Sequence, residues 1–242
     1  MKRRGIAAAE TSFDKSAGAR EMRLQNEVGV YESSEIEETM AEHMDEVRGC
    51  YARAGRAQRY AGGQVTLRFL VNGAGKTQDV LVIANDLGNY DVERCLVDVG
   101  RQVKFPAPQG NKATTFEYPV EFKSTHEMQV QDLDDSMKVD RDVAAFMHSL
   151  SACGAVTESG ASAIFYVDPS GGVGSVGLAS ESVLDEQAGA CLVREMRRWR
   201  MSATLPGRML RCRANIPAVI AAAEPPAPRR ATLSAVGRKR RR

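Results

Sequence analysis

Apolar and polar residues alternate in the first half of the chain, and turn residues separate the alternating stretches. Apolar side chains occupy every second position from Val65 to Val71, which is the period of a half-buried strand. The segment Asn72–Gly75 has the composition of a turn, and Val80 and Val82 begin a return strand. This pattern predicts a β-hairpin.

Segments with helical periodicity flank the hairpin. Apolar residues spaced three or four apart run from Ile36 to Ala54, and Ser34 with Glu37 has the spacing of a capping box. A second helix is predicted over Val92–Val103, and alternation returns in Thr114–Phe122. The predicted order of elements is α-β-β-α-β.

The same unit occurs twice. When the chain is shifted so that Val71 falls on Val167, Cys95-Leu96-Val97 falls on Cys191-Leu192-Val193 without a gap. Repeated domain-sized units are typical of binding or scaffolding proteins. We predict an α+β fold of two tandem α-β-β-α-β modules, each a small three-stranded antiparallel sheet packed on helices. The core of the first module is predicted to contain Val65, Leu67, Phe69, Val80, Leu96, Val99 and Phe116.

Composition divides the chain further. We expect a flexible N-terminal arm over residues 1–30, the first module over 31–124 and an acidic linker over 125–136. The second module, over 137–220, has fewer apolar residues and is a diverged copy. Residues 221–242 are predicted to be a disordered tail rich in proline and arginine.

Charge and hydropathy exclude few functions. The 242 residues carry a net charge of +2, which predicts no overall electrostatic partner. No apolar run approaches the roughly 20 residues of a membrane span, so we expect no transmembrane segment. Met1–Arg4 resembles the start of a signal peptide, but no apolar core follows it.

Four of the five cysteines occupy matched places in the two modules, on the apolar faces of the predicted helices. We expect the disulfides Cys50–Cys95 and Cys153–Cys191, each closing a loop worth about 4 kcal/mol of chain entropy. The alternative is a pair of buried thiols in each module. Cys212 takes the place of Phe116 and is predicted to be a core thiol.

Two glycine-rich segments resemble phosphate-binding loops. Gly73–Thr77 is similar to the end of a Walker A loop, and Gly172–Gly177 matches G-x-G-x-x-G. Each lies within a predicted hairpin and is not followed by a helix, so we interpret both as turn glycines. The histidines, serines and cysteines of this sequence do not have the spacing of a catalytic site or of a metal site. We therefore expect no enzymatic activity, no cofactor and no metal.

A set of motifs in the first module resembles a known family. The motifs are Glu46–Tyr51, Gly63–Phe69, Leu87–Asn89, Val92–Leu96, Phe105–Pro108 and Tyr118–Phe122. They resemble the AgmX/PglI C-terminal domain, a branch of the TonB C-terminal superfamily, over residues 31–124. The resemblance implies a periplasmic protein related to gliding-motility proteins and TonB-like transducers, with cell-envelope or outer-membrane partners. The cytoplasm is the alternative location, since no signal peptide is visible.

The resemblance also implies that the last strand of the module, Thr114–Phe122, is a sheet edge that receives a partner strand by β-augmentation. Pro119 supports an edge position, because proline cannot donate to a central ladder. The residues expected to face the partner are Thr115, Glu117, Pro119 and Glu121. The two glutamates favour a basic segment, and the tail of a second copy is one candidate, which would give self-association.

Other interpretations of these edges and of the tail stay open. The closing strand of the second module, Leu210–Ile216, is expected to be an edge that prefers acidic partners, because arginines flank it. Both strands could instead be edges protected against aggregation. The basic tail allows a cytoplasmic scaffold or nucleic-acid-associated protein as the alternative function. We do not expect nucleic acid as the partner, since the tail has no aromatic residues for stacking.

Overall fold

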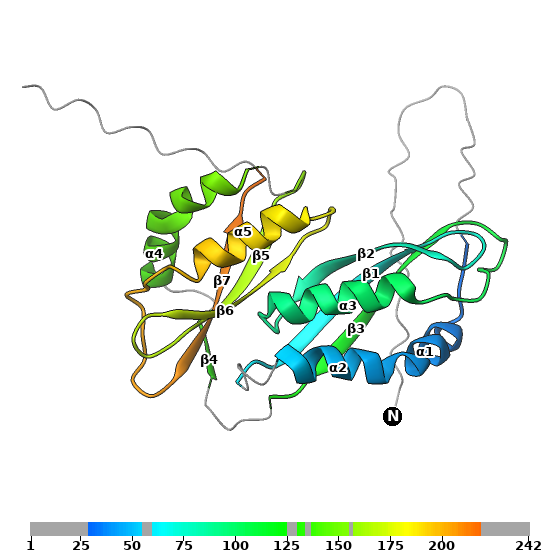
Figure 1. Ribbon diagram of the computed structural model, residues 1–242, viewed down its shortest axis with the longest axis horizontal. Coiled ribbons are helices and arrows are strands. Elements are labelled where there is room, and N and C mark those ends of the chain that lie inside the picture. Colours follow the sequence, from blue (N-terminus) through cyan, green and yellow to red (C-terminus); the bar gives the residue numbers. More distant parts are fainter. Residues whose placement is uncertain (1–28, 55–59, 125–129, 134–136, 155–156, 219–242) are drawn as a thin grey trace, which may run out of the picture.

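The structure is a computed structural model that describes residues 29–54, 60–124, 130–133, 137–154 and 157–218. Two α+β modules lie side by side, each with a small sheet and helices packed on one face of it (Figure 1). The elements are α1 (Ser33–Glu42), α2 (Met44–Ala54), β1 (Gly63–Val71), β2 (Thr77–Asn85), α3 (Tyr90–Gln102), β3 (Thr114–Phe122), β4 (Val130–Leu133), α4 (Met137–Met147), the 3-10 helix η1 (His148–Cys153), β5 (Ala161–Val167), β6 (Val173–Ala179), α5 (Glu186–Met196) and β7 (Met209–Ile216). The predicted arm up to residue 28 and the predicted tail lie outside the described residues.

The first module has an antiparallel sheet of strand order β2-β1-β3. The alternation of β1 points Phe69 and its apolar neighbours toward the helices, where Phe69 is fully buried. Phe69 is opposite Val80 in β2 and Phe116 in β3, and the two phenylalanine rings stack at 5.2 Å. All predicted core residues of this module are buried except Phe116, which is half-buried.

The predicted first helix is two helices. The helical path is interrupted at His43, with φ −98° and ψ 2°, and α2 begins at the next residue. The interruption lets Met40 of α1 and Val47 of α2 both reach the same core, where both are buried. The N-cap is Glu32, whose N–H donates to Glu35 Oε2 at 2.9 Å. The predicted capping box at Ser34 was therefore placed two residues too late.

The second module repeats the register of the first but has a four-stranded sheet of order β4-β7-β5-β6. Phe165 is opposite Val176 and Cys212, the counterparts of Val80 and Phe116. The additional strand, β4, comes from the predicted linker and pairs in parallel with β7. The sequence pattern did not predict β4, because apolar and polar residues do not alternate in Val130–Leu133. This segment is a strand because its backbone pairs with β7. The prediction of three strands in this module was wrong on this point.

The two sheets approach each other through β2 and β6. The Ser180 N–H, directly after β6, donates to the Val82 carbonyl of β2 at 2.8 Å. The Ser175 hydroxyl of β6 donates to the carbonyl of Gly88, in the loop before α3. Because β2 and β3 are on opposite sides of β1, this contact leaves β3 on the far edge of the first sheet.

Candidate functional site: the outer edge of β3

β3 has one edge paired with β1 and an outer edge with no partner strand among the described residues. Pro119 is opposite Thr66 within this ladder, and proline has no N–H to donate to β1. Backbone groups of alternate residues point to alternate sides of a strand. Thr115, Glu117 and Glu121 therefore direct both their N–H and their C=O outward, and Pro119 directs its C=O outward.

The side chains at this edge are exposed, and two of the four are acidic. All four residues predicted to face a partner are exposed, and they lie on the face of the sheet opposite the helices: Thr115, Glu117, Pro119 and Glu121. Glu117 Oε1 accepts hydrogen bonds from Arg68, the closest at 2.8 Å, and about half of its side chain stays exposed. Tyr118 is half-buried beside α1. Burial raises the pKa of Tyr118, and the negative charge of Glu37 raises it to a smaller extent. Carboxylates thus lie on both sides of the strand.

The equivalent edge in the second module is occupied. β4 pairs with the first half of β7, with Val130 opposite Met209 and Leu133 opposite Cys212. The prediction that Leu210–Ile216 is a free edge was therefore wrong for its first half. Arg211, one of the arginines expected to attract an acidic partner, instead forms a bidentate ion pair with Asp132 of β4 within the chain.

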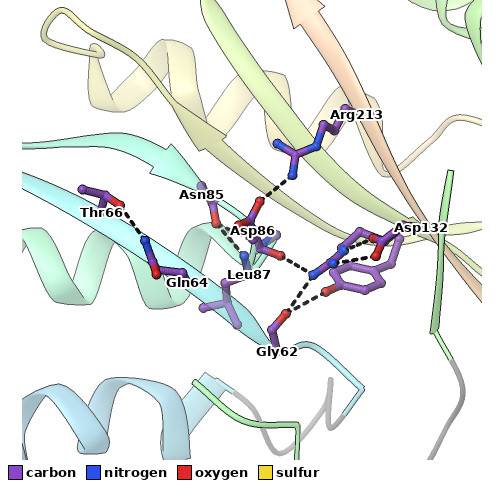
Figure 2. A network of polar contacts seen from close by, with 11 residues as sticks. Gly62, Gln64, Thr66, Asn85, Asp86, Leu87, Asp132 and Arg213 are labelled. Atoms are coloured by element: carbon purple, nitrogen blue, oxygen red, sulfur yellow. Dashed lines mark hydrogen bonds and ion pairs between the residues drawn. The ribbon is translucent and has the colours of Figure 1, made fainter. Parts of the chain in front are cut away.

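Arg211 also connects both strands to the first module. Its Nη1 donates to the carbonyls of Gly62 at 3.2 Å and Asp86 at 3.1 Å. Figure 2 shows this junction, in which Gly62, Asp86 and Asp132 surround the arginine. Arg213 pairs with the Asp86 carboxylate at 2.5 Å. The hydrogen bonds from Arg211 lower the pKa of Asp132. Nothing in the linear pattern indicated this role for an arginine on an expected edge.

A carboxylate is enclosed between the modules. Glu93 of α3 is 2% exposed and accepts hydrogen bonds from Asn85 Nδ2 at 2.6 Å, from Asn89 N at 3.0 Å and from Leu178 N of β6 at 2.8 Å. Burial raises the pKa of Glu93 to about 8, against the opposing effect of these bonds. A Cβ at Gly177 would lie 2.1 Å from Glu93 Oε1, so only glycine fits there. Gly177 is therefore a junction residue within β6, and its prediction as a turn glycine was wrong.

Both expected cysteine pairs are joined. Cys50–Cys95 connects α2 to α3 with an S–S distance of 2.08 Å, and Cys153–Cys191 connects η1 to α5 at 2.05 Å. Each bridge ties the helix before a hairpin to the helix after it. Cys212 is buried in the core of the second module, outside both disulfides.

The Walker-like segment is a hairpin turn. Asn72 accepts the N–H of Gly75 and its side chain accepts the N–H of Lys76, and β2 begins at Thr77. Gly75 has a φ of 81°, and its carbonyl accepts the N–H of Phe105. This segment thus joins β1 to β2 and supports the end of α3, with no helix after it to hold phosphate.

No family model, curated protein or solved structure matches this chain. No helix in the described part of the chain is long and apolar enough to cross a membrane. The same residues contain no group of three or more histidine, cysteine, aspartate or glutamate side chains placed to hold a metal ion. The outer edge of β3 is therefore the candidate site on its geometry and on the motif resemblance alone.

Proposed function

We propose that the protein is a non-enzymatic interaction module of the cell envelope that binds an extended, basic segment of an envelope or outer-membrane protein along β3. The observation that carries this proposal is β4. In the second module a short polar segment of the chain adds to the strand equivalent to β3, in parallel. The same edge of the first module has no added strand among the described residues, and the Gly29 N–H bonds only the Ala113 carbonyl just before β3, at 3.1 Å, so an external segment can pair beyond that point, along Thr115–Glu121.

The charges support a basic partner. β7 carries Arg211 and pairs with the acidic Asp132. In the common register Glu117 of β3 corresponds to Arg213 of β7, since their β1 and β5 partners, Arg68 and Ile164, are themselves equivalent. At this position the outward charge of β3 is thus inverted relative to that of β7, while Arg211 corresponds to the neutral Thr115. Charge complementarity across such an interface raises the association rate and suppresses wrong partners.

Two disulfides support an oxidising compartment such as the periplasm. Both lie between secondary-structure elements of a small domain, and such bridges persist in secreted and periplasmic proteins and are rare in the cytosol. This compartment agrees with the location that the motif resemblance implies.

The test uses substitutions that act on the edge itself. Pro119→Ala adds an outward N–H, which should strengthen binding of a proline-free peptide of alternating arginine and valine by about 1 kcal/mol, or roughly fivefold. Glu117→Lys with Glu121→Lys should weaken the same binding at least about tenfold. Isothermal titration calorimetry measures both effects. The matched control is Glu42→Lys with Glu158→Lys, which changes the net charge equally at exposed positions outside β3.

Capture from a cell-envelope fraction checks the biological partner. The Glu117→Lys, Glu121→Lys chain should retain less of the partner than the control chain. Equal capture by both chains, with circular dichroism showing an intact fold, would exclude this edge as the binding site.

A further inference from the structure

The chain leaves the second module beside the first sheet. Ile216 and Pro217, at the end of β7, line a shallow hollow together with Ile83 of β2 and Glu181. The chain after β7 therefore lies at the β2 side of the first sheet, on the face that the helices do not cover. Strands in a sheet are about 4.8 Å apart, so β3 lies about 10 Å beyond β2.

Carboxylates mark the path from this exit to β3. Glu181 extends from the second module and pairs with Arg68 of β1, and Arg68 also pairs with Glu117 of β3. Glu121, four residues after Glu117 in β3, is also exposed. Three carboxylates and one arginine thus lie between the exit of the chain and the edge of β3, which leaves a net negative charge along this path.

The segment that follows has the complementary charge and enough length. Residues 219–228, if extended, span about 30 Å, which exceeds the distance to β3. Arg229 and Arg230 come next, and the basic run from Arg238 to Arg242 follows. The intervening Ala231–Gly237 contains no proline and no charge, so its backbone can pair with an edge along its whole length.

We propose that residues 229–242 bind in cis along β3 of the same molecule, so that this basic arm is an internal ligand that a partner strand must displace. The inference rests on the proposed function of the β3 edge. A tethered segment acts at an effective concentration on the order of mM, so even a weak strand of this kind competes with an external one. Partner binding is then regulated by the arm, and any partner that sequesters the arginines opens the site.

The experiment compares the full chain with a chain that lacks residues 225–242. The probe is a synthetic peptide of residues 229–242. The shortened chain should bind it at least about tenfold more tightly than the full chain, and Glu117→Lys with Glu121→Lys should abolish that gain. Hydrogen exchange should show protected amides at Thr115, Glu117 and Glu121 in the full chain, and faster exchange after truncation.

The outcomes separate the two proposals. Equal binding of the peptide by both chains overturns the internal ligand but leaves the edge as a binding site. Failure of the shortened chain to bind either this peptide or the arginine–valine peptide overturns the proposed function itself. A dimer that requires residues 225–242, detected by light scattering, overturns the cis arrangement in favour of exchange between copies. Equal binding of a scrambled peptide overturns strand pairing.

Discussion

Glu93 predicts a specific pH dependence of stability. Its pKa changes from 4.5 to about 8 on folding because the carboxyl group becomes fully buried between the modules. At 1.36 kcal/mol per pKa unit, the ionised form costs about 5 kcal/mol relative to a carboxyl whose pKa does not change on folding. Between pH 4.5 and 8 the folded protein keeps a proton that the unfolded chain has released. The contribution of Glu93 to stability is therefore highest below pH 4.5 and falls by about 1.4 kcal/mol per pH unit until the folded pKa is passed.

The perturbation is Glu93→Gln, which removes the titration but keeps an oxygen to accept from Asn85 and Asn89. It loses the acceptor for the Leu178 N–H, a cost that does not depend on pH. The stability difference between wild type and variant should shift by about 2 kcal/mol in favour of the variant from pH 6 to pH 7.5. Urea denaturation at both pH values measures the shift. A constant difference would refute the reasoning, and Glu42→Gln, at an exposed site, should follow wild type.

Two further predictions concern the junction and the disulfides. Arg211→Ala should destabilise the protein by about 2–3 kcal/mol in urea denaturation, because it removes charged hydrogen bonds to Asp132 and to two carbonyls of the first module. Hydrogen exchange in β4 should accelerate in that variant. Unchanged exchange would show that β4 stays paired with β7 without the Arg211 side chain. Thiol titration of denatured, unreduced protein should find one thiol of the five cysteines, and five thiols would contradict both disulfides. Reduction should lower stability by about 4 kcal/mol per bridge in the chain-entropy model.

Local patterns predicted those elements whose own residues determine them. The alternation of β1, the turn before Thr77 and the apolar face of α3 were all visible in the sequence, and so was the order of elements apart from β4 and the division of the first helix into α1 and α2. The repeat predicted both disulfides, because matched pairs of cysteines on matched helices must face equivalent cores. The outward direction of the β3 backbone also follows from one residue, Pro119.

What the sequence did not predict depends on contacts between segments that are distant in the chain. Glu93 follows a helical pattern that gives a charged residue no reason to be buried, and β6 of the other module helps to cover it. β4 exists because β7 offers unpaired backbone groups and Arg211 offers a counter-charge. Gly177 did carry a signal, since a glycine within a strand suggests close approach of another group. It was assigned to a turn because of its neighbouring glycines.

The divergence of the second module follows from its contacts. It presents β6 to β2, and the Glu93–Leu178 hydrogen bond holds that contact at a position where Gly177 leaves no room for a side chain. Its own β7 edge is partly filled by β4. Each of these contacts covers a strand edge that an undiverged copy would expose. Exposed edges recruit unrelated strands and cause aggregation, so covering them is an advantage in itself. Under the proposed function, a duplicated module that had kept its original surface would compete with the first for the same partner strand. The second module instead contacts the first module on the β2 side, and β3 has no added strand at its outer edge among the described residues.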